Sequence, residues 1–395
     1  MNHAGSDPFA VADFYDIITK LCALHLAAYY FSRCIMDGKI RKICDDFNEN
    51  HDFSGVCFLG RGDDVVFEQA YGFAHRGFRI PNSLSTMFDT ASVTKVFTAT
   101  AVLLLIKKGL LNFDEKITDI INLAGTAIPT DVTIYHLLTH TSGIADDADE
   151  EAGENYSDLF IRKPNYSIRN TSDFLPQFAY KQPIFKAGTN VRYNNCAFVL
   201  LGLAIEKATG QDYRSFVLDN IFKPLGMLCT KFCAMDEINE NAAEGYVACH
   251  DENNHFTKWK KNIYSYPPVG SPDGGAYTTS RDLDLFIRKL KENILLGEEY
   301  TNMLFAPHCK FVRPFSKWKP VPNATIRNGY AFEFVEIEGD VFCMRKDGIN
   351  DGVGAMLSYY PQIDTTVIIL CNQDCDIWQM HREIQTILYN DCYIK

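Results

Sequence analysis

The chain has 395 residues, of which 47% are hydrophobic and 22% are charged, and it carries a formal net charge of -12. This size and composition are typical of a globular protein with a large core, in one big domain or two closely joined ones. Because nucleic-acid binders usually present a basic face and this sequence has no dense block of Lys and Arg, we expect no nucleic-acid partner.

Residues 8–50 show a helical pattern, with an expected break near Asp37-Gly38. The most apolar part, Ile17 to Ser32, is interrupted by a lysine and a histidine and is too short to cross a membrane. The residues before it are acidic rather than basic, which is unlike a secretory signal. We therefore predict that residues 1–37 form an N-terminal helical extension and that the protein has no transmembrane segment.

Thirteen cysteines are scattered along the chain, and no two of them form a Cys-x-x-Cys pair. A zinc ribbon or thioredoxin motif is therefore not expected, although two pairs spaced four residues apart remain alternatives for a metal site or a disulfide. So many free thiols are typical of a reducing compartment and favour a cytoplasmic location. His136 and His140 have the spacing of two zinc ligands on a helix, but the Glu of a zinc-protease motif is missing, which favours a structural role.

Strand patterns begin after residue 50. Two runs, 53–59 and 65–71, flank a polar turn and predict a β-hairpin. Between about residues 91 and 275, helical patterns and loops dominate. Within that region 195–210 is strongly helical, and the acidic segment 146–158 is expected to be an exposed loop.

The C-terminal part returns to strands. Four runs form two further hairpins and a closing helix follows, at 330–337, 341–345, 353–360, 365–371 and 376–389. We therefore predict an α+β fold in which one antiparallel sheet, flanked by helices, is built from about residues 50–90 and 276–395. A mostly helical region, 91–275, is inserted between the two parts of the sheet, and residues 38–395 form this domain.

Ser92-Val93-Thr94-Lys95 lies directly before a long apolar run that ends at Lys107-Lys108-Gly109. This context places Ser92 and Lys95 at the N-terminal end of a buried helix. Residues three apart share a helix face, so the hydroxyl and the amine would touch where the helix dipole favours negative charge. Such a pair can activate a serine nucleophile. A second Ser-x-x-Lys copy, at Ser316, lies among prolines with no helical pattern after it and indicates a basic loop.

Tyr193-Asn194-Asn195 stands before the apolar helical run. A phenol can act as a general base only where nearby cations lower its pKa, and Lys95 could do this for Tyr193. The amide of Asn195 can hold a substrate amide. A second Tyr-x-Asn, at Tyr300, lies in an acidic helical stretch and is discounted.

Lys346-Asp347-Gly348 ends an expected strand. Glycine at such a strand end lets the backbone approach a ligand closely, and the lysine can bind a substrate carboxylate or adjust the tyrosine. The pattern is weak alone, because Lys107-Lys108-Gly109 and Lys186-Ala187-Gly188 also match it.

The order Ser-x-x-Lys, Tyr-x-Asn, Lys-x-Gly resembles the serine β-lactamase and penicillin-recognising family, especially class C β-lactamases, D-Ala-D-Ala carboxypeptidases and related esterases. Three further stretches match the family's general pattern, at 114–119, 133–143 and 274–282. The resemblance covers about residues 38–390. It implies that residues 38–395 form a catalytic domain with the β-lactamase/DD-peptidase fold.

The resemblance also implies site residues: catalytic Ser92, Lys95 and Tyr193, and substrate-binding Asn195, Lys346, Gly348 and Ile349. Ser92 would form the acyl-enzyme while Lys95 and Tyr193 share proton transfer, with Tyr193 as the base. The backbone N–H groups of Ser92 and Ile349 would form the oxyanion hole. No metal or cofactor is expected, and the partner would be a small-molecule or short-peptide substrate.

The expected function is thus a serine hydrolase that cleaves an amide, ester or β-lactam bond through a Ser92 acyl-enzyme. Many esterase-like family members carry His where Lys346 stands, so Lys346 favours a peptidase or a β-lactamase. Asp351 makes the following turn acidic and could repel a substrate carboxylate, which leaves the substrate class open. The alternative function is that of a non-catalytic ligand-binding or sensor protein on the same scaffold.

Overall fold

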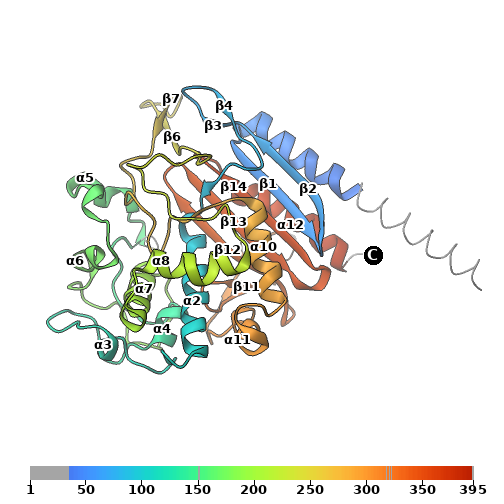
Figure 1. The fold of residues 1–395 in the computed structure, drawn as a ribbon. Helices are drawn as coiled ribbons and strands as arrows, with labels where there is room; N and C mark the ends of the chain where they lie inside the picture. Colours follow the sequence, from blue (N-terminus) through green and yellow to red (C-terminus); the bar gives the residue numbers. More distant parts are fainter. Residues whose placement is uncertain (1–34, 150–151, 317, 320, 322, 394–395) are drawn as a thin grey trace, which may run out of the picture.

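The computed structural model describes residues 35–149, 152–316, 318–319, 321 and 323–393. The predicted extension at residues 1–37 lies almost wholly outside them, as does the apolar stretch 17–32. Over the described part, helices and an antiparallel sheet combine in an α+β fold, which confirms the predicted class (Figure 1). In the described part of the chain, no helix combines the length and the apolar character needed to span a membrane.

The centre of the fold is an eight-stranded antiparallel sheet whose spatial order is β2-β1-β14-β13-β12-β11-β10-β9. Two early strands therefore join six late ones, and β1 pairs with β14 from Gly55 opposite Cys371 to Arg61 opposite Thr365. The strand bounds are β1 Gly55–Arg61, β2 Asp64–Tyr71, β9 Val312–Pro314, β10 Thr325–Asn328, β11 Glu333–Ile337, β12 Asp340–Asn350, β13 Val353–Tyr360 and β14 Thr365–Cys371.

Both faces of the central strands are buried, because every residue of β13 and β14 is buried. Side chains alternate across a strand. Accordingly, Cys57 and Ile369 pack in one cluster with a helix over residues 35–51 and with α12 (Ile377–Tyr393). On the opposite face, Phe58 packs in a second cluster with helices that include α10 (Ser280–Lys291).

The helix over residues 35–51 runs through Gly38 without interruption, so the predicted break near Asp37-Gly38 is wrong. One exposed glycine costs a helix only about 1 kcal/mol. The apolar contacts that Met36, Ile40 and Phe47 make in the core outweigh that cost.

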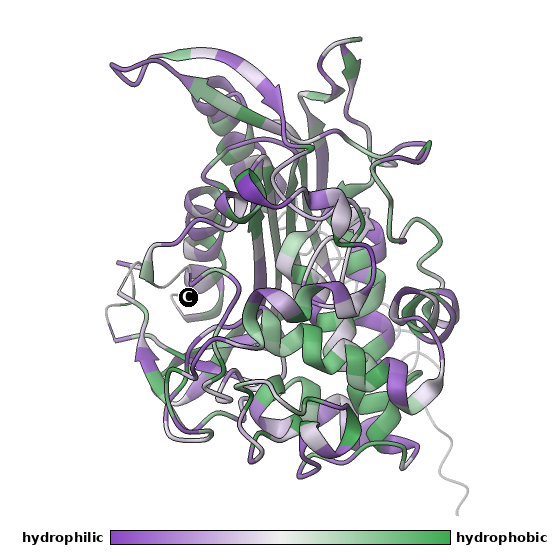
Figure 2. Cartoon of the chain, turned by 90° about the vertical axis from the view of Figure 1, so that its left-hand side faces the viewer, coloured by the Kyte–Doolittle hydropathy of each residue, from purple (hydrophilic) through white to green (hydrophobic). Residues whose placement is uncertain are grey.

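The second face carries the helical layer, whose apolar residues are concentrated in its inner helices (Figure 2). Its longest members are α2 (Lys95–Lys107) and α7 (Cys196–Thr209), and all but two residues of α2 are buried. Shorter helices surround them: α3 Ile117–Ile120, α4 Ile134–Leu138, α5 Leu159–Arg162, α6 Leu175–Phe178, α8 Tyr213–Val217, α9 Lys223–Leu225 and α11 Gly297–Leu304. Because α2 is apolar on all sides, it lies inside the fold. The turn that precedes it contacts strands β12 and β13 of the sheet.

Three two-stranded sheets complete the fold and have no counterpart among the predicted strands. They pair β3 Phe73–His75 with β4 Ile80–Pro81, β5 Phe88–Asp89 with β8 Tyr277–Thr278, and β6 Tyr246–His250 with β7 Phe256–Lys261. The last pair lies within 91–275, the stretch expected to be mostly helical. The short pair β5–β8 matters most for the site, because β5 leads directly into the turn that carries Ser92.

Candidate active site

The backbone before Ser92 is held in an unusual conformation. Ser92 lies in a 3-10 turn, Ala91–Thr94, directly before α2, and Ala91 has a φ of 43°, which is uncommon for a residue with a side chain. Asp89 Oδ1 accepts a hydrogen bond from Ala91 N at 2.7 Å. Gly275 N donates to Ala91 O at 3.2 Å. The turn is therefore fixed both by its own strand and by the stretch 274–282.

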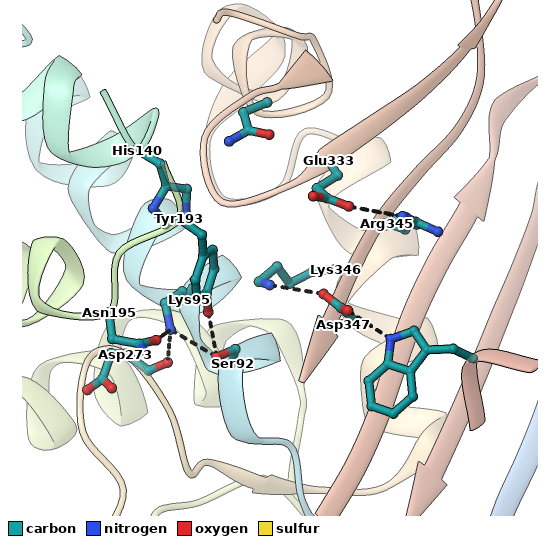
Figure 3. Close-up of polar contacts among 12 residues, drawn as sticks. Ser92, Lys95, His140, Tyr193, Asn195, Asp273, Glu333, Arg345, Lys346 and Asp347 are labelled. Carbon is teal, nitrogen blue, oxygen red and sulfur yellow. Dashed lines mark hydrogen bonds and ion pairs between the residues drawn. The ribbon is translucent and has the colours of Figure 1, made fainter. Parts of the chain in front are cut away.

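Two side chains donate hydrogen bonds to Ser92 Oγ: Tyr193 Oη at 2.7 Å and Lys95 Nζ at 3.0 Å (Figure 3). Lys95 is fully buried. It also donates to Asn195 Oδ1 at 2.8 Å and to the backbone oxygen of Asp273 at 2.5 Å. The amine thus connects the serine turn with two distant segments of the chain, which lie 100 and 178 residues after Lys95.

Strand β12 brings a second lysine to the same tyrosine. Lys346 Nζ lies 4.9 Å from the centre of the Tyr193 ring, and Lys95 Nζ lies 5.1 Å from it. Lys346 is buried and donates to Asp347 Oδ1 at 3.3 Å, while Trp378 Nε1 donates to Asp347 Oδ2 at 2.8 Å. Burial alone would raise the pKa of Asp347, but Lys346 and Arg345 hold it below its usual value.

Gly348 lies against the backbone of the serine turn. A Cβ atom on Gly348 would be 2.2 Å from Thr90 O and 2.9 Å from Ser92 N, far inside normal contact distance. Only glycine lets β12 approach this turn so closely. Ile349, the next residue, is 57% exposed and lines both cavities that meet at Ser92. The structure therefore brings together all seven residues predicted for the site.

His140 belongs to the same cluster, although its spacing to His136 favoured a purely structural role. Its ring packs against the Tyr193 ring, tilted by 36° with 4.8 Å between the ring centres, and its Nδ1 accepts a hydrogen bond from Asn194 N at 3.2 Å. Its backbone oxygen accepts from Arg192 N at 3.0 Å. Burial, aided by Lys95 and other nearby cations, holds the pKa of His140 well below its ordinary value, so the ring is neutral.

His136 and His140 do not form a zinc pair. Helix α4 ends at Leu138, and His140 follows it with a φ of 58°. His136 Nδ1 accepts a hydrogen bond from Thr133 N at 3.2 Å and closes the N-terminus of that helix. A group of three buried residues of ligand type among the described residues consists of Asp146, Asp147 and Cys196, and its Asp146 lines the same cavity as His140. The eleven cysteines of the described part are all free thiols.

Asp146 was expected in an exposed loop, and this expectation is wrong, because Asp146 and Asp147 are buried. Asp146 Oδ2 accepts from Asn195 N at 2.8 Å and Oδ1 accepts from Cys196 N at 3.0 Å. It therefore caps the N-terminus of α7, where Asn195 makes no capping bond of its own. Burial raises the pKa of Asp146, although these two amides oppose the shift.

We expect Asp146→Ala to lower the free energy of unfolding by about 1–3 kcal/mol, because two buried amides lose their acceptor. Urea unfolding measures this change. Asp158→Ala is the matched control, since Asp158 belongs to the same acidic segment but is exposed. It should change the free energy by less than about 0.5 kcal/mol. Equal effects of the two substitutions would contradict the capping role.

Two cavities meet at Ser92. We call the first the acidic arm. It is lined by Ser92, Asn195 and Ile349 together with Asp89, Asp273, Met235, Tyr266 and residues 267–271. We call the second the charged arm. It is lined by Ser92, Tyr193, Gly348 and Ile349 together with His140, Asp146, Arg313, Asn328, Ala331, Glu333, Lys346 and Asp347. A substrate bound across Ser92 can therefore extend in two directions that differ in chemistry.

Known proteins resemble this chain in sequence and in fold. The model of the Beta-lactamase family matches residues 40–388. A penicillin-binding protein of Bacillus halodurans has a similar structure, with a TM-score of 0.79 and 33% identity over 88% of this chain and 99% of that one. A class C β-lactamase shares the fold alone, with a TM-score of 0.67 at 18% identity over 90% of this chain and 97% of the other.

Curated relatives match over shorter parts. "Penicillin-binding protein 4*" of Bacillus subtilis (strain 168) is 29% identical over 68% of this chain and 59% of its own length. "Esterase EstB" of Burkholderia gladioli is 35% identical over 44% of this chain and 45% of its own length. The matches thus span about half of each relative. The family match over most of the chain shows that the protein belongs to the beta-lactamase family.

Proposed function

We propose that the protein cleaves an amide or ester bond of a small molecule or short peptide through an acyl-enzyme on Ser92. One observation carries this proposal: Ser92 Oγ lies within hydrogen-bond distance of both the Tyr193 hydroxyl and the Lys95 amine. A nucleophile in contact with a possible base, which is itself held by a third group, is the arrangement that acyl transfer requires.

Tyr193 is the proposed base. Positive charge near a phenol favours its ionised form, and two lysine amines lie about 5 Å from this ring. Tyr193 would take the proton of Ser92 Oγ as Oγ attacks the carbonyl carbon, and would pass it to the leaving group. Lys95 would stabilise the charges in this exchange. In deacylation, a water oxygen would attack the acyl carbon while Tyr193 takes its proton. The bond from that carbon to Ser92 Oγ would then break, and Tyr193 would return the proton to Oγ.

The backbone N–H groups of Ser92 and Ile349 are the proposed oxyanion hole. The close approach of β12 at Gly348 supports this assignment, because it sets the strand directly against Ser92 N. Such donors, fixed before the reaction begins, stabilise the negative oxygen of the tetrahedral intermediate. The amide oxygen of Asn195 accepts a hydrogen bond from Lys95, so we assign the substrate contact to the amide nitrogen of Asn195.

Lys346 and the charged arm help to choose among an amide, an ester and a β-lactam as the bond that the enzyme cleaves. Lys346 and Arg313 line this arm, each paired with a carboxylate, Asp347 and Glu333 respectively. We propose that a substrate carboxylate binds to the remaining N–H donors of these two cations, as a peptidase or a β-lactamase would require. Asp351 lies outside the residues that line it, so repulsion of a carboxylate by Asp351 is a weak effect there. We therefore place an amide substrate with a carboxylate, or a β-lactam, ahead of a simple ester.

A substrate panel tests the proposal. Wild type and Ser92→Ala should be assayed with nitrocefin, p-nitrophenyl esters and D-amino-acid amides. We expect wild type to turn over at least one class and Ser92→Ala to lose at least about 1,000-fold in kcat/KM. Binding that raises the melting temperature with no turnover of any class would favour the sensor alternative instead.

A further inference from the structure

His140 is hydrogen-bonded to both neighbours of the proposed base Tyr193, yet the proposed reaction assigns it no role. It lies just after the end of α4, is 4% exposed and lines the charged arm. Its backbone oxygen accepts a hydrogen bond from Arg192 N at 3.0 Å, and its Nδ1 accepts one from Asn194 N at 3.2 Å. A single residue therefore fixes the backbone on both sides of Tyr193.

The ring of His140 also limits the movement of the Tyr193 side chain (Figure 3). The two ring centres are 4.8 Å apart, and the His140 ring lies 5.2 Å from the ring of Phe198 in α7. The hydrogen bond from Tyr193 Oη to Ser92 Oγ is 2.7 Å long, and a shift of about 1 Å would break it. The contacts of His140 therefore act on the atom pair that begins the proposed reaction.

The backbone of His140 is in the left-handed region, with a φ of 58°. This conformation is uncommon for a residue with a side chain, and residues held in it cluster at functional sites. It lets one residue present both its carbonyl oxygen and its ring to residues 192–194. By contrast, His136 accepts a hydrogen bond from Thr133 N and closes the N-terminus of α4 without a positive φ.

The hydrogen bond from Asn194 N defines the tautomer of His140. Nδ1 accepts only while it carries no proton, so the ring proton lies on Nε2. Burial and the nearby cations hold the pKa of His140 well below its ordinary value, and the ring stays neutral at pH 6.5, where a free histidine is half protonated. Besides Tyr193, the charged groups around this ring are Lys95, Arg313, Lys346, Asp146, Glu333 and Asp347.

We propose that His140 is a positioning residue for Tyr193, whose Nδ1 atom and backbone oxygen hold residues 192–194 so that the phenol stays within hydrogen-bond distance of Ser92 Oγ. This inference rests on the proposed function, in which Tyr193 takes the proton of Ser92. His140 itself exchanges no proton in the reaction. Without the Nδ1 acceptor, the buried Asn194 N loses its partner, and the segment that carries Tyr193 shifts to regain one.

Two substitutions separate the acceptor from the backbone conformation. Asparagine carries an oxygen where histidine carries Nδ1 and tolerates a positive φ, so His140→Asn keeps an acceptor for Asn194 N. Glycine fits the same φ but offers no acceptor. We expect His140→Asn to keep kcat within about fivefold of wild type and His140→Gly to lower it about 100-fold with little change in KM. Equal kcat values in the two folded variants would overturn the proposal.

His136 supplies the matched control, because its Nδ1 also accepts from a backbone amide but serves α4 instead of Tyr193. His136→Gly should lower the free energy of unfolding and leave kcat at the wild-type value. A merely structural role of His140 would give the same pattern in His140→Gly, with lower stability and wild-type kcat, and would contradict the positioning role. If His140→Gly does not fold, His140→Gln, which likewise has no acceptor at the Nδ1 position, replaces it.

NMR of isotope-labelled histidine and tyrosine needs no turnover, so it separates failure of the His140 role from failure of the hydrolase proposal. At pH 6.5 we expect the His140 ring to have an unprotonated Nδ1 and a protonated Nε2. The Cζ signal of Tyr193, assigned with Tyr193→Phe, should keep its wild-type position in His140→Asn and move in His140→Gly or His140→Gln. A protonated Nδ1 in wild type, or a Tyr193 signal that no substitution of His140 moves, would overturn the inference.

Discussion

Lys95→Met should lower kcat by about 1,000-fold, the effect of losing a group that shares proton transfer and charge stabilisation. Methionine matches the length of the lysine stem but supplies no amine. Asn195 Oδ1 and the Asp273 backbone oxygen lose the hydrogen bond from Lys95, and Ser92 Oγ keeps only the one from Tyr193. The measurement is the steady-state rate on the best substrate of the panel, compared with the extent of Ser92 acylation in a single turnover.

The matched control is Lys107→Met, at the other end of the same helix. Lys107 is exposed, and its Nζ reaches only the Leu295 backbone oxygen, at 3.3 Å. This variant should keep wild-type kcat. If Lys95→Met is folded by circular dichroism and retains more than a tenth of the wild-type rate, Lys95 has no share in proton transfer.

Gly348→Ala should lower kcat by about 100-fold or more, because a shift of about 1 Å at an oxyanion site costs this much. The added methyl group would overlap Thr90 O and Ser92 N, which are backbone atoms and cannot rotate away. Strand β12 and the serine turn would have to separate. We expect the loss in kcat rather than in KM, since the oxyanion contact forms fully only in the transition state.

Gly38→Ala serves as the control for Gly348→Ala. A Cβ on Gly38 would have no atom within 4 Å, and alanine favours the helix in which Gly38 lies. It should leave kcat unchanged and increase stability slightly. A Gly348→Ala enzyme with wild-type kcat would show that the contact between β12 and Ser92 N is not part of the catalytic geometry.

The fold class and the members of the candidate site could be predicted because their signals are local. The four residues from Ser92 to Lys95 and the apolar run after them already indicate a hydroxyl and an amine side by side. Strand-like runs on either side of short turns in the C-terminal part likewise indicate two hairpins. Tyr193 and Lys346 are distant in sequence, so their meeting at Ser92 was expected from the family resemblance rather than from spacing.

The residues that were missed depend on tertiary packing. Asp146 lies in an acidic stretch whose composition indicates an exposed loop, and only the fold shows that it turns inward to cap α7. His140 lies past the end of α4 with a positive φ, so helical spacing misplaces it.

The most direct test of the account is covalent labelling of Ser92. Wild type and Ser92→Ala should be treated with a fluorophosphonate probe and with a penicillin, and their intact masses measured. We expect one adduct per chain on wild type, mapped to Ser92 by peptide mass spectrometry, and none on Ser92→Ala. A wild-type protein that stays unlabelled by every such probe, or an adduct that persists in folded Ser92→Ala, would contradict a Ser92 acyl-enzyme.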